Sequence, residues 1–212
     1  GSWTPAIHDD AAAPIFLVGF PRSGTTLLDQ ILDSHPLLAT LEEKPAIDAV
    51  AAEVAAMEGG YPGALATLSA DDVGRLRGVY RSAVAAYLGA PLDGATLVDK
   101  MPLNSVDAGL IHRLFPDARF LLSLRHPCDV VLSGFMQAFR PNPAMVQFST
   151  LADTAALYAQ VMDLWRRYAR VLPLAVHAVR YEDLVADLEG EARRVLTFLD
   201  LPWDDTVLEY AE

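Results

Sequence analysis

Short apolar runs alternate along the chain with longer segments in which apolar residues recur every three or four positions. Short runs rich in branched residues are typical of strands buried in a parallel sheet, and the helical spacing is typical of helices that pack on such a sheet. The predicted strands cover residues 15–18, 37–41, 95–99, 119–124 and 174–179. Helices are predicted at residues 45–57, 104–114 and 150–170. Three more are predicted to begin near residue 25, after residue 69 and after residue 127, and short helical pieces are predicted up to residue 199.

This alternation predicts an α/β fold of three layers, in which a parallel sheet of about four or five strands has helices on both faces. Ser69, followed three residues later by Asp72, predicts the start of one covering helix. Its predicted apolar face consists of Val73, Leu76, Tyr80, Ala83, Tyr87 and Leu88. Residues 136–149 predict a loop. Because ligands of parallel sheets bind beyond the carboxyl ends of the strands, we expect the functional residues there.

The chain has 212 residues, of which 52% are hydrophobic and 21% are charged, and these values predict one globular domain. We place that domain at residues 14–212, after a lead-in of residues 1–13 in which Gly1-Ser2 looks like a cloning remnant. The net charge of −12 argues against a nucleic-acid partner, because nucleic-acid binding depends on a basic surface.

The chain contains one cysteine, Cys128, so it cannot form an intrachain disulfide. No apolar run approaches the roughly 18 residues that span a bilayer, and no basic region followed by an apolar core opens the sequence. These features predict a cytoplasmic protein without a transmembrane segment. His35 and His112 have no partners at metal-ligand spacing, so we expect both to be structural and predict no metal site.

The most informative stretch follows the first predicted strand and reads Gly19-Phe20-Pro21-Arg22-Ser23-Gly24-Thr25-Thr26. A strand, a glycine-bearing turn and a helix together direct backbone N–H groups at an anion. Gly19 and Gly24 have the spacing of a Walker A loop, which predicts a P-loop-like domain, but Thr25 stands where that loop has its lysine. The cation is instead Arg22, whose planar guanidinium matches phosphate or sulfate oxygens. We therefore expect a phosphate-like group here without the usual triphosphate chemistry.

The segment from Pro21 to Thr26 resembles the 5′-phosphosulfate loop of sulfotransferases that use 3′-phosphoadenosine 5′-phosphosulfate (PAPS). It looks most like the loop of tyrosylprotein sulfotransferases and of their bacterial relatives, which are often linked to tetratricopeptide repeats. The resemblance implies a set of residues that bind the 5′-phosphosulfate, namely Arg22, Ser23, Gly24, Thr25 and Thr26.

A second arginine, Arg125, ends a predicted strand, and Ser133 follows eight residues later in the next predicted helix. An arginine and a hydroxyl placed in this way can converge on one phosphate. Sulfotransferases that use PAPS have a similar pair at the 3′-phosphate. The resemblance therefore assigns Arg125 and Ser133 to that phosphate and Tyr181 to the region of the adenosine. The alternative is a surface arginine that pairs with Asp129.

Two adjacent carboxylates, Glu42 and Glu43, follow the second predicted strand, and Lys100 follows the third. A positioned carboxylate can remove the proton of an attacking hydroxyl, and a lysine can stabilise charge on a leaving phosphate. The resemblance selects Glu43 as the general base and places Lys100 at the bridging oxygen and the sulfuryl group. Because adjacent residues point in different directions, we expect only one carboxylate to face the reaction. The alternatives are a solvated acidic turn and a surface lysine that pairs with Asp99.

The resemblance implies in-line transfer of a sulfuryl group from PAPS to an acceptor hydroxyl, with adenosine 3′,5′-bisphosphate as product and no metal requirement. The acceptor could be a tyrosine, a sugar, a lipid or a small molecule, and the sequence does not define the oligomeric state. Members of the family continue past the position of Glu212 with a segment that covers the nucleotide, and we expect either that this sequence is incomplete or that the segment is absent. The alternatives are a non-catalytic nucleotide-binding module and a P-loop kinase or nucleotide hydrolase.

Overall fold

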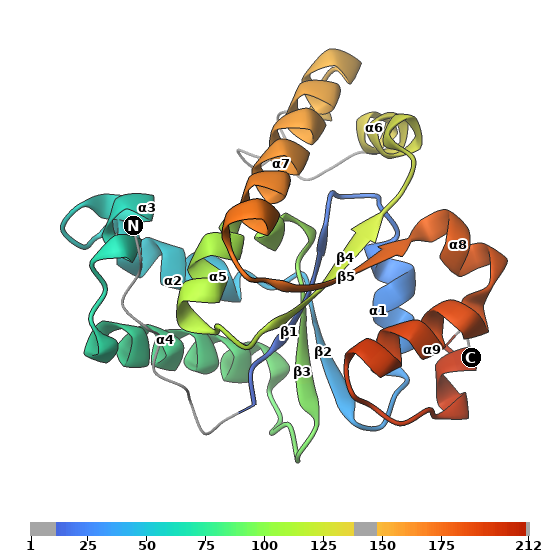
Figure 1. The fold of residues 1–212 in the computed structure, drawn as a ribbon, viewed down its shortest axis with the longest axis horizontal. Helices are drawn as coiled ribbons and strands as arrows, with labels where there is room; N and C mark the ends of the chain where they lie inside the picture. The colour runs from blue at the N-terminus through green and yellow to red at the C-terminus, as the bar shows by residue number, and fades with distance from the viewer. Residues whose placement is uncertain (1–11, 138–147, 211–212) are drawn as a thin grey trace.

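Five strands form one sheet with helices on both faces (Figure 1). A computed structural model describes residues 12–137 and 148–210. The strands are β1 (Ile15–Gly19), β2 (Leu38–Glu42), β3 (Thr96–Lys100), β4 (Arg119–Leu124) and β5 (Ala175–Arg180). Their order is β2-β3-β1-β4-β5, and every neighbouring pair is parallel. The predicted fold class is therefore confirmed.

The helices connect successive strands and cover the sheet (Figure 1). The α-helices are α1 (Thr25–Asp33), α2 (Ala46–Ala55), α3 (Gly60–Gly63), α4 (Ala70–Leu88), α5 (Ala108–Leu114), α6 (Pro127–Met136), α7 (Leu151–Val171), α8 (Tyr181–Ala186) and α9 (Leu188–Phe198). The short 3₁₀ helices are η1 (Ala64–Ala66), η2 (Pro102–Asp107) and η4 (Asp205–Leu208). Across the described ranges, no helix combines the length and the apolar character needed to cross a membrane.

The central strand β1 is buried on both faces, as a strand in the middle of a covered parallel sheet should be. Phe16 and Val18 point into a core shared with α2, α4, α5 and α7. Ile15 and Leu17 point into a second core shared with α1 and α9. Because side chains alternate along a strand, one short apolar run supplies both cores and fixes the position of the loop that follows it.

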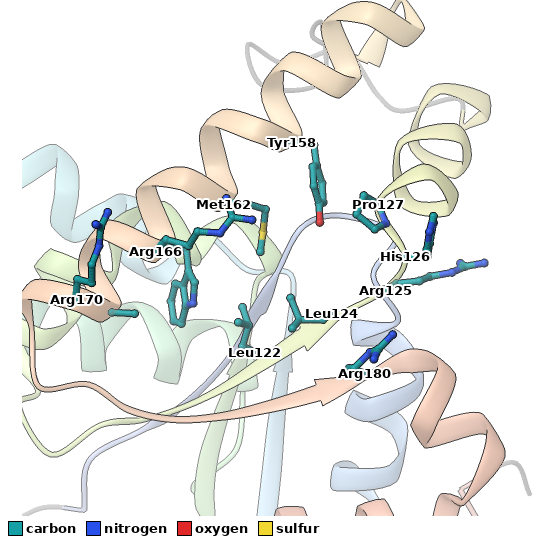
Figure 2. Close-up of a pocket in the computed structure, with 12 residues that line it drawn as sticks. Leu122, Leu124, Arg125, His126, Pro127, Tyr158, Met162, Arg166, Arg170 and Arg180 are labelled. Carbon is teal, nitrogen blue, oxygen red and sulfur yellow. The ribbon is translucent and has the colours of Figure 1, made fainter.

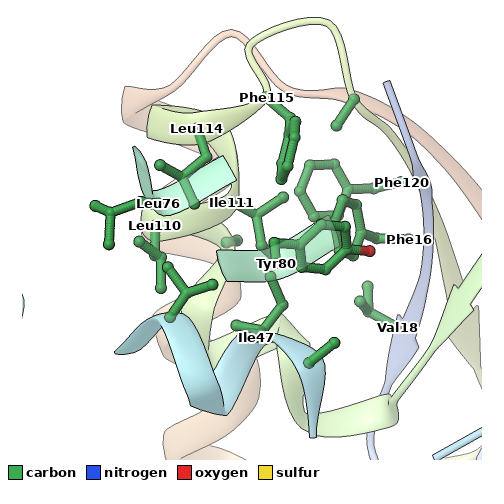
Figure 3. Packing of buried hydrophobic residues seen from close by; sticks show 14 of the residues in the cluster. Phe16, Val18, Ile47, Leu76, Tyr80, Leu110, Ile111, Leu114, Phe115 and Phe120 are labelled. Carbon is green, nitrogen blue, oxygen red and sulfur yellow. The ribbon is translucent and has the colours of Figure 1, made fainter. Parts of the chain in front are cut away.

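Aromatic rings fill the first core next to β1 (Figure 3). The ring of Phe16 stacks on Phe120 of β4 at 5.8 Å and lies 6.1 Å from Tyr80 of α4. Tyr80 also meets the edge of Phe115 at 5.2 Å. Such pairs add specific geometry to the burial of large apolar surface, so they lock α4 and α5 onto the sheet.

The helix predicted for residues 104–114 is in fact two pieces, η2 and α5. Pro102 begins the first piece, and its turns are tighter than those of an α-helix. Asn104 Nδ2 donates to Asp99 Oδ1 at 3.3 Å, and Ser105 Oγ donates to the Gly19 carbonyl at 3.2 Å. These side-chain bonds hold the first piece against the ends of β1 and β3.

Two residues of α4 differ from the predicted pattern. Tyr87 is 44% exposed, although the adjacent Leu88 packs against the core. Arg77 is buried instead, and its Nε donates to the Leu114 carbonyl at 2.6 Å. The loop predicted for residues 136–149 lies mostly outside the described residues, which resume at residue 148.

The predicted start of α4 is confirmed by a capping box. Asp72 N–H donates to Ser69 Oγ at 3.1 Å, and Ser69 N–H donates to Asp72 Oδ2 at 3.0 Å. Replacing Ser69 by alanine should lower the free energy of unfolding by about 0.5–2 kcal/mol, measured by urea denaturation. Ser82→Ala, in the exposed middle of the same helix, is the matched control and should change it by less than about 0.5 kcal/mol. Equal losses in both variants would contradict the capping role.

Candidate active site

Every strand of the sheet ends at a residue that the sequence predicts to be functional, or at most three positions before one. Arg22 lies after β1, Glu43 after β2, Arg125 after β4 and Tyr181 after β5, while Lys100 is the last residue of β3. Because all neighbouring strand pairs are parallel, these residues lie along one edge of the sheet. The strand order places them across that edge in the sequence Glu43, Lys100, Arg22, Arg125 and Tyr181.

The loop after β1 has a strained backbone conformation, and Gly24 is the residue that allows it. Arg22 and Gly24 both lie in the left-handed region, with φ of 74° and 97°. A Cβ atom at Gly24 would lie 2.5 Å from Cδ2 of Tyr181. The loop and the aromatic ring thus approach so closely that only glycine fits, and any side chain there would push Tyr181 away.

The first turn of α1 is open to an anion. The helix begins at Thr25 after Gly24, which provides no side-chain cap, so the N–H groups of this turn lack intrahelical acceptors. Ser23 is used differently, because its N–H donates to the Phe20 carbonyl at 3.1 Å and its hydroxyl is buried without a partner among the described residues. The donors that remain for an anion are therefore the N–H groups of Gly24, Thr25 and Thr26.

A pocket of about 590 Å³ opens above this loop. Of the predicted residues, it is lined by Arg22, Gly24, Thr25, Thr26, Glu43, Arg125 and Tyr181. The sequence did not indicate the remaining wall residues, which are Pro21, Leu27, Met101, Pro102, Leu103 and Gln137. Most of these are apolar residues next to a motif, and such residues have the same pattern as core positions. Apart from its two arginines, the pocket therefore has polar and apolar wall residues in similar numbers.

The two arginines meet the same helix. Arg22 Nε donates to Ser133 Oγ of α6 at 3.1 Å. Arg125 and Ser133 together line an adjoining depression of about 360 Å³. The guanidinium of Arg125 lies over the ring of Tyr181, 4.7 Å from its centre. The structure thus brings the three residues assigned to the 3′-phosphate region close together, and it adds a direct bond from the 5′-side arginine to Ser133.

A carboxylate that the sequence did not single out joins the loops after β4 and β5. Glu182 Oε1 accepts the backbone N–H of His126 at 2.7 Å. This bond holds the pKa of Glu182 below its usual range, together with the arginines nearby. Since His126 follows Arg125 and Glu182 follows Tyr181, the bond fixes the two residues that form the stacked pair.

Lys100 is fully buried and holds both carboxylates of the acidic pair. Its Nζ donates to Glu42 Oε1 at 2.9 Å and to Glu43 Oε1 at 3.0 Å. Both carboxylates can reach it because Glu43 has a left-handed φ of 48°, which breaks the alternation of the strand, while its N–H donates to the Lys100 carbonyl at 2.7 Å. Both carboxylates therefore contact Lys100, and of the two only Glu43 also lines the pocket.

The alternative that Lys100 is a surface lysine paired with Asp99 is wrong. Lys100 has 0% exposure, and Asp99 points to the other face of β3. There Asp99 Oδ2 accepts the hydroxyl of Tyr80 at 2.9 Å. Burial raises the pKa of Asp99 to about 7, so this carboxyl group belongs to the core rather than to the site.

Asp29 is a third carboxyl group beside Lys100, and no sequence pattern indicated it. It lies on α1 with 5% exposure, and its Oδ1 has no hydrogen-bond partner among the described residues. Burial raises its pKa to about 6, the charge of Lys100 lowers it, and the charges of Glu42 and Glu43 raise it again. The ammonium of Lys100 is therefore surrounded by acidic groups on α1 and β2.

The histidine predictions can be checked at one position. The ring of His35 is buried, with Nε2 3.0 Å from the Pro202 carbonyl and Nδ1 accepting the N–H of Leu37 at 3.2 Å. This ring therefore has the structural role predicted for it. Within residues 12–137 and 148–210, no group of three or more histidine, cysteine, aspartate or glutamate side chains is arranged to hold a metal ion.

Comparison with known proteins identifies relatives of the whole described fold. Residues 14–205 match the profile of a family described as the sulfotransferase family. The chain is 32% identical over 93% of its length to an uncharacterized protein of Aquifex aeolicus, and 29% identical over 99% of its length to protein-tyrosine sulfotransferase 1 of Danio rerio. Among solved structures, the sulfotransferase domain of the Synechococcus olefin synthase superposes with a TM-score of 0.64 and 23% identity, covering 100% of this chain and 82% of that domain. At this identity the superposition shows a shared fold.

The chain spans only part of the curated relatives that it matches. The alignments cover 26% of the Aquifex protein and 59% of the Danio enzyme. What those whole proteins do is therefore not transferred by similarity alone.

The raised pKa of Asp29 predicts a pH-dependent stability. The unfolded carboxyl ionises near pH 3.8 and the folded one near 6, so the unfolded state loses its proton first as the pH rises. Stability from this group is present below about pH 3.8 and is lost as the pH rises through about 6. Asp29→Asn removes the ionisation, and its unfolding free energy relative to the unsubstituted chain should rise across this window and then level off.

The measurement is urea unfolding at several pH values between 4 and 8, on the order of five points across the transition. Gln30→Asn, a change at the exposed neighbour on α1, has no ionisable group and should shift stability by the same amount at every pH. A constant difference for Asp29→Asn as well would sink the claim that burial raises this pKa.

Proposed function

The chain belongs to the sulfotransferase family, and we propose that it transfers a sulfuryl group from PAPS to an acceptor hydroxyl. The observation that carries the proposal is the pair of guanidinium groups, Arg22 and Arg125, that line one pocket of about 590 Å³. PAPS presents anionic oxygens at two positions, the 5′-phosphosulfate and the 3′-phosphate, and the pocket offers one arginine for each.

In this proposal the loop after β1 holds the 5′-phosphosulfate. Its donors are the guanidinium of Arg22 and the N–H groups of Gly24, Thr25 and Thr26 at the start of α1. Arg125 and Ser133 hold the 3′-phosphate, and Tyr181 lies beside the adenosine. Because Arg22 already donates to Ser133, a bound nucleotide would replace that bond with bonds to its own oxygens.

The reaction needs a base on the acceptor and a cation at the leaving group. Glu43 lines the pocket, and we assign it the removal of the acceptor proton. When Glu43 takes that proton it becomes neutral and releases its hold on Lys100, so the lysine can turn its charge toward the departing 5′-phosphate. Glu42 is then the carboxylate that keeps Lys100 charged and in place, which makes it a positioning residue.

The pocket wall beside Glu43 indicates which acceptors can bind there. Met101, Pro102 and Leu103 line the pocket on that side, and these residues favour a ring-bearing or otherwise apolar acceptor over a strongly hydrated one. The Danio relative is named a protein-tyrosine sulfotransferase, so a phenolic hydroxyl is the first acceptor to test. Sugars, lipids and other small hydroxyl compounds are the further arms of the test. A cytoplasmic location remains a prediction from the sequence.

The deciding experiment offers PAPS with labelled sulfate to the purified chain together with phenols, sugars, lipids and tyrosine peptides. Transfer of label to any hydroxyl supports the proposal. Tight binding of the bisphosphate without transfer to any acceptor would support the alternative of a non-catalytic nucleotide-binding module. Hydrolysis of ATP with Mg²⁺, at a rate that Arg22→Ala reduces, would favour the kinase or hydrolase alternative, against which Thr25 in the lysine position already argues.

The assignment of two phosphate positions predicts a ligand preference. Adenosine 3′,5′-bisphosphate should raise the melting temperature more than AMP does, and Arg125→Ala should remove most of that difference. Losing one charged hydrogen bond costs about 1.5–3 kcal/mol, or roughly a tenfold to a hundredfold loss of affinity. Arg119→Ala, at the opposite end of β4, is the matched control and should keep the preference. Equal stabilisation by the two nucleotides in the unsubstituted chain would overturn the assignment.

The acidic pair predicts two different losses of turnover. Glu43→Gln should reduce kcat by about 10²–10⁴ and keep bisphosphate binding within a few-fold, because Gln fills the same volume but accepts no proton. Glu42→Gln should reduce kcat by about tenfold, because it removes one of two charged bonds to Lys100 and leaves the base in place.

Steady-state kinetics across about pH 6–9 distinguish the two roles, since a phenol with a pKa near 10 loses its proton more easily at high pH. The loss in Glu43→Gln should therefore shrink as the pH rises, while the loss in Glu42→Gln should not. Glu58→Gln, an exposed acid after α2, is the control for a lost charge alone. If Glu42→Gln shows the larger and pH-dependent loss, the two roles are reversed.

A further inference from the structure

A second cavity, larger than the proposed active site, lies between α7 and the strands β4 and β5 (Figure 2). Its volume is about 830 Å³, and Arg125 is the one residue, within the described ranges, that lines both cavities. We call it the arginine groove, after four arginines that line it, namely Arg125, Arg166, Arg170 and Arg180. The proposed transfer reaction makes no use of it.

The floor of the arginine groove is apolar. Leu122 and Leu124 of β4 and Met162 of α7 point toward one another (Figure 2), and Trp165 and Ala169 of α7 also line the cavity. Trp165 is 4% exposed and Met162 is 8% exposed, so both belong to the packed interior and hold the floor rigid. An apolar body of drug-like size can bury its surface here, in a cavity within the range of small-molecule sites.

The rim of the arginine groove is basic. Arg125, Arg166, Arg170 and Arg180 line it, and none of the lining residues is an aspartate or a glutamate. Figure 2 shows Arg170 toward one end of the floor and Arg180 with Arg125 toward the other, with Arg166 between them. On a chain of net charge −12, this is a local concentration of positive charge.

Internal ion pairs leave much of this charge available. Arg166 pairs with Asp163 at 2.7 Å, but both side chains are more than half exposed, so water screens the pair and a ligand can compete for the arginine. The contact from Arg180 to Asp183 is 4.0 Å long. Arg170 has no carboxylate partner among the described residues. The guanidinium groups can therefore turn toward an oxyanion in the groove.

We propose that the arginine groove binds an amphiphilic anion, a small molecule with an apolar ring body and a carboxylate, sulfate, sulfonate or phosphate group. The apolar body lies on Leu122, Leu124 and Met162, and the anionic group meets Arg166 and Arg170. The site is distinct from the nucleotide pocket, since the glycine loop and the start of α1 line only that pocket. A free molecule fits the recessed floor better than the headgroup of a lipid bilayer, because the floor lies between a helix and two strands.

The probe for this site is 8-anilinonaphthalene-1-sulfonate, which has an apolar body and one sulfonate, and it is followed by fluorescence titration of the intact chain. We expect one saturable site. The double variant Arg166→Gln/Arg170→Gln should weaken it by about tenfold or more, because it removes charged hydrogen bonds. Arg167→Gln, on the same helix but outside the groove, is the matched control and should bind as the unsubstituted chain does. Melting temperatures of all variants check that the fold is intact.

Three further arms locate the site. Ala169→Phe should block the probe by filling the floor while leaving bisphosphate binding unchanged. N-phenyl-1-naphthylamine, which lacks the sulfonate, should bind at least about tenfold more weakly than the probe, as loss of charged hydrogen bonds requires. Vesicles of phosphatidylglycerol should not retain the chain on sedimentation.

Several results would overturn the proposal. If the probe concentration at half-saturation rises in proportion to added bisphosphate, the two ligands compete and the groove is part of the nucleotide pocket. Equal binding of the neutral amine would remove the role of charge, and equal binding by the double variant and the Arg167→Gln control would place the probe elsewhere. Retention on vesicles that depends on Arg166 and Arg170 would replace the free molecule by a membrane surface. Because no arm requires turnover, failure here is separate from failure of the proposed transferase activity.

Discussion

Parallel pairing of all five strands is the constraint on which the site depends. Each parallel connection must return the chain to the same starting edge through a helix, so all five carboxyl ends lie along the opposite edge. Residues as distant in sequence as Arg22 and Ser133 then come within 3.1 Å of each other. The two aromatic and aliphatic cores hold this arrangement from both faces. The strained loop after β1 is tolerated because its neighbours, Tyr181 above all, leave it no alternative conformation.

The buried ammonium of Lys100 sets the chemistry of the other half of the edge. A charge with 0% exposure must be compensated, and here two carboxylates at 2.9 and 3.0 Å compensate it. Both carboxylates are more than half exposed, so they connect the buried charge to the pocket and to solvent. A proton that arrives on Glu43 therefore changes the balance at Lys100 directly. In the proposed reaction, this coupling links proton removal from the acceptor by Glu43 to stabilisation of the leaving phosphate by Lys100.

The periodicity of apolar residues was enough to predict the strands, most helices and the edge at which the site lies, because those features depend on burial and on the alternation of side chains. It was not enough to predict that Glu42 and Glu43 both contact Lys100. That arrangement depends on the left-handed φ of Glu43, a backbone property that the spacing of residues does not reveal. Asp29 and Arg77 escaped for a related reason: each lies in a helix whose pattern accounts for it as an exposed residue, and each becomes buried through contacts with distant segments. The prediction for Tyr87 is wrong in the opposite sense, because its position in the helical pattern predicts burial and the side chain is 44% exposed.

The acidity of the chain does not conflict with two sites for anions. At physiological ionic strength a charge acts over about 8 Å, so an anion in a recess responds mainly to the groups that line it. Among the residues that the structure describes, Glu43 is the one acidic residue that lines the proposed active site, and none lines the arginine groove. Arg125 lines both cavities, and its guanidinium is held over Tyr181 by the loop that Glu182 fixes. In the proposed groove complex the anionic group meets Arg166 and Arg170, so Arg125 keeps its place over Tyr181 and the two sites bind their ligands independently.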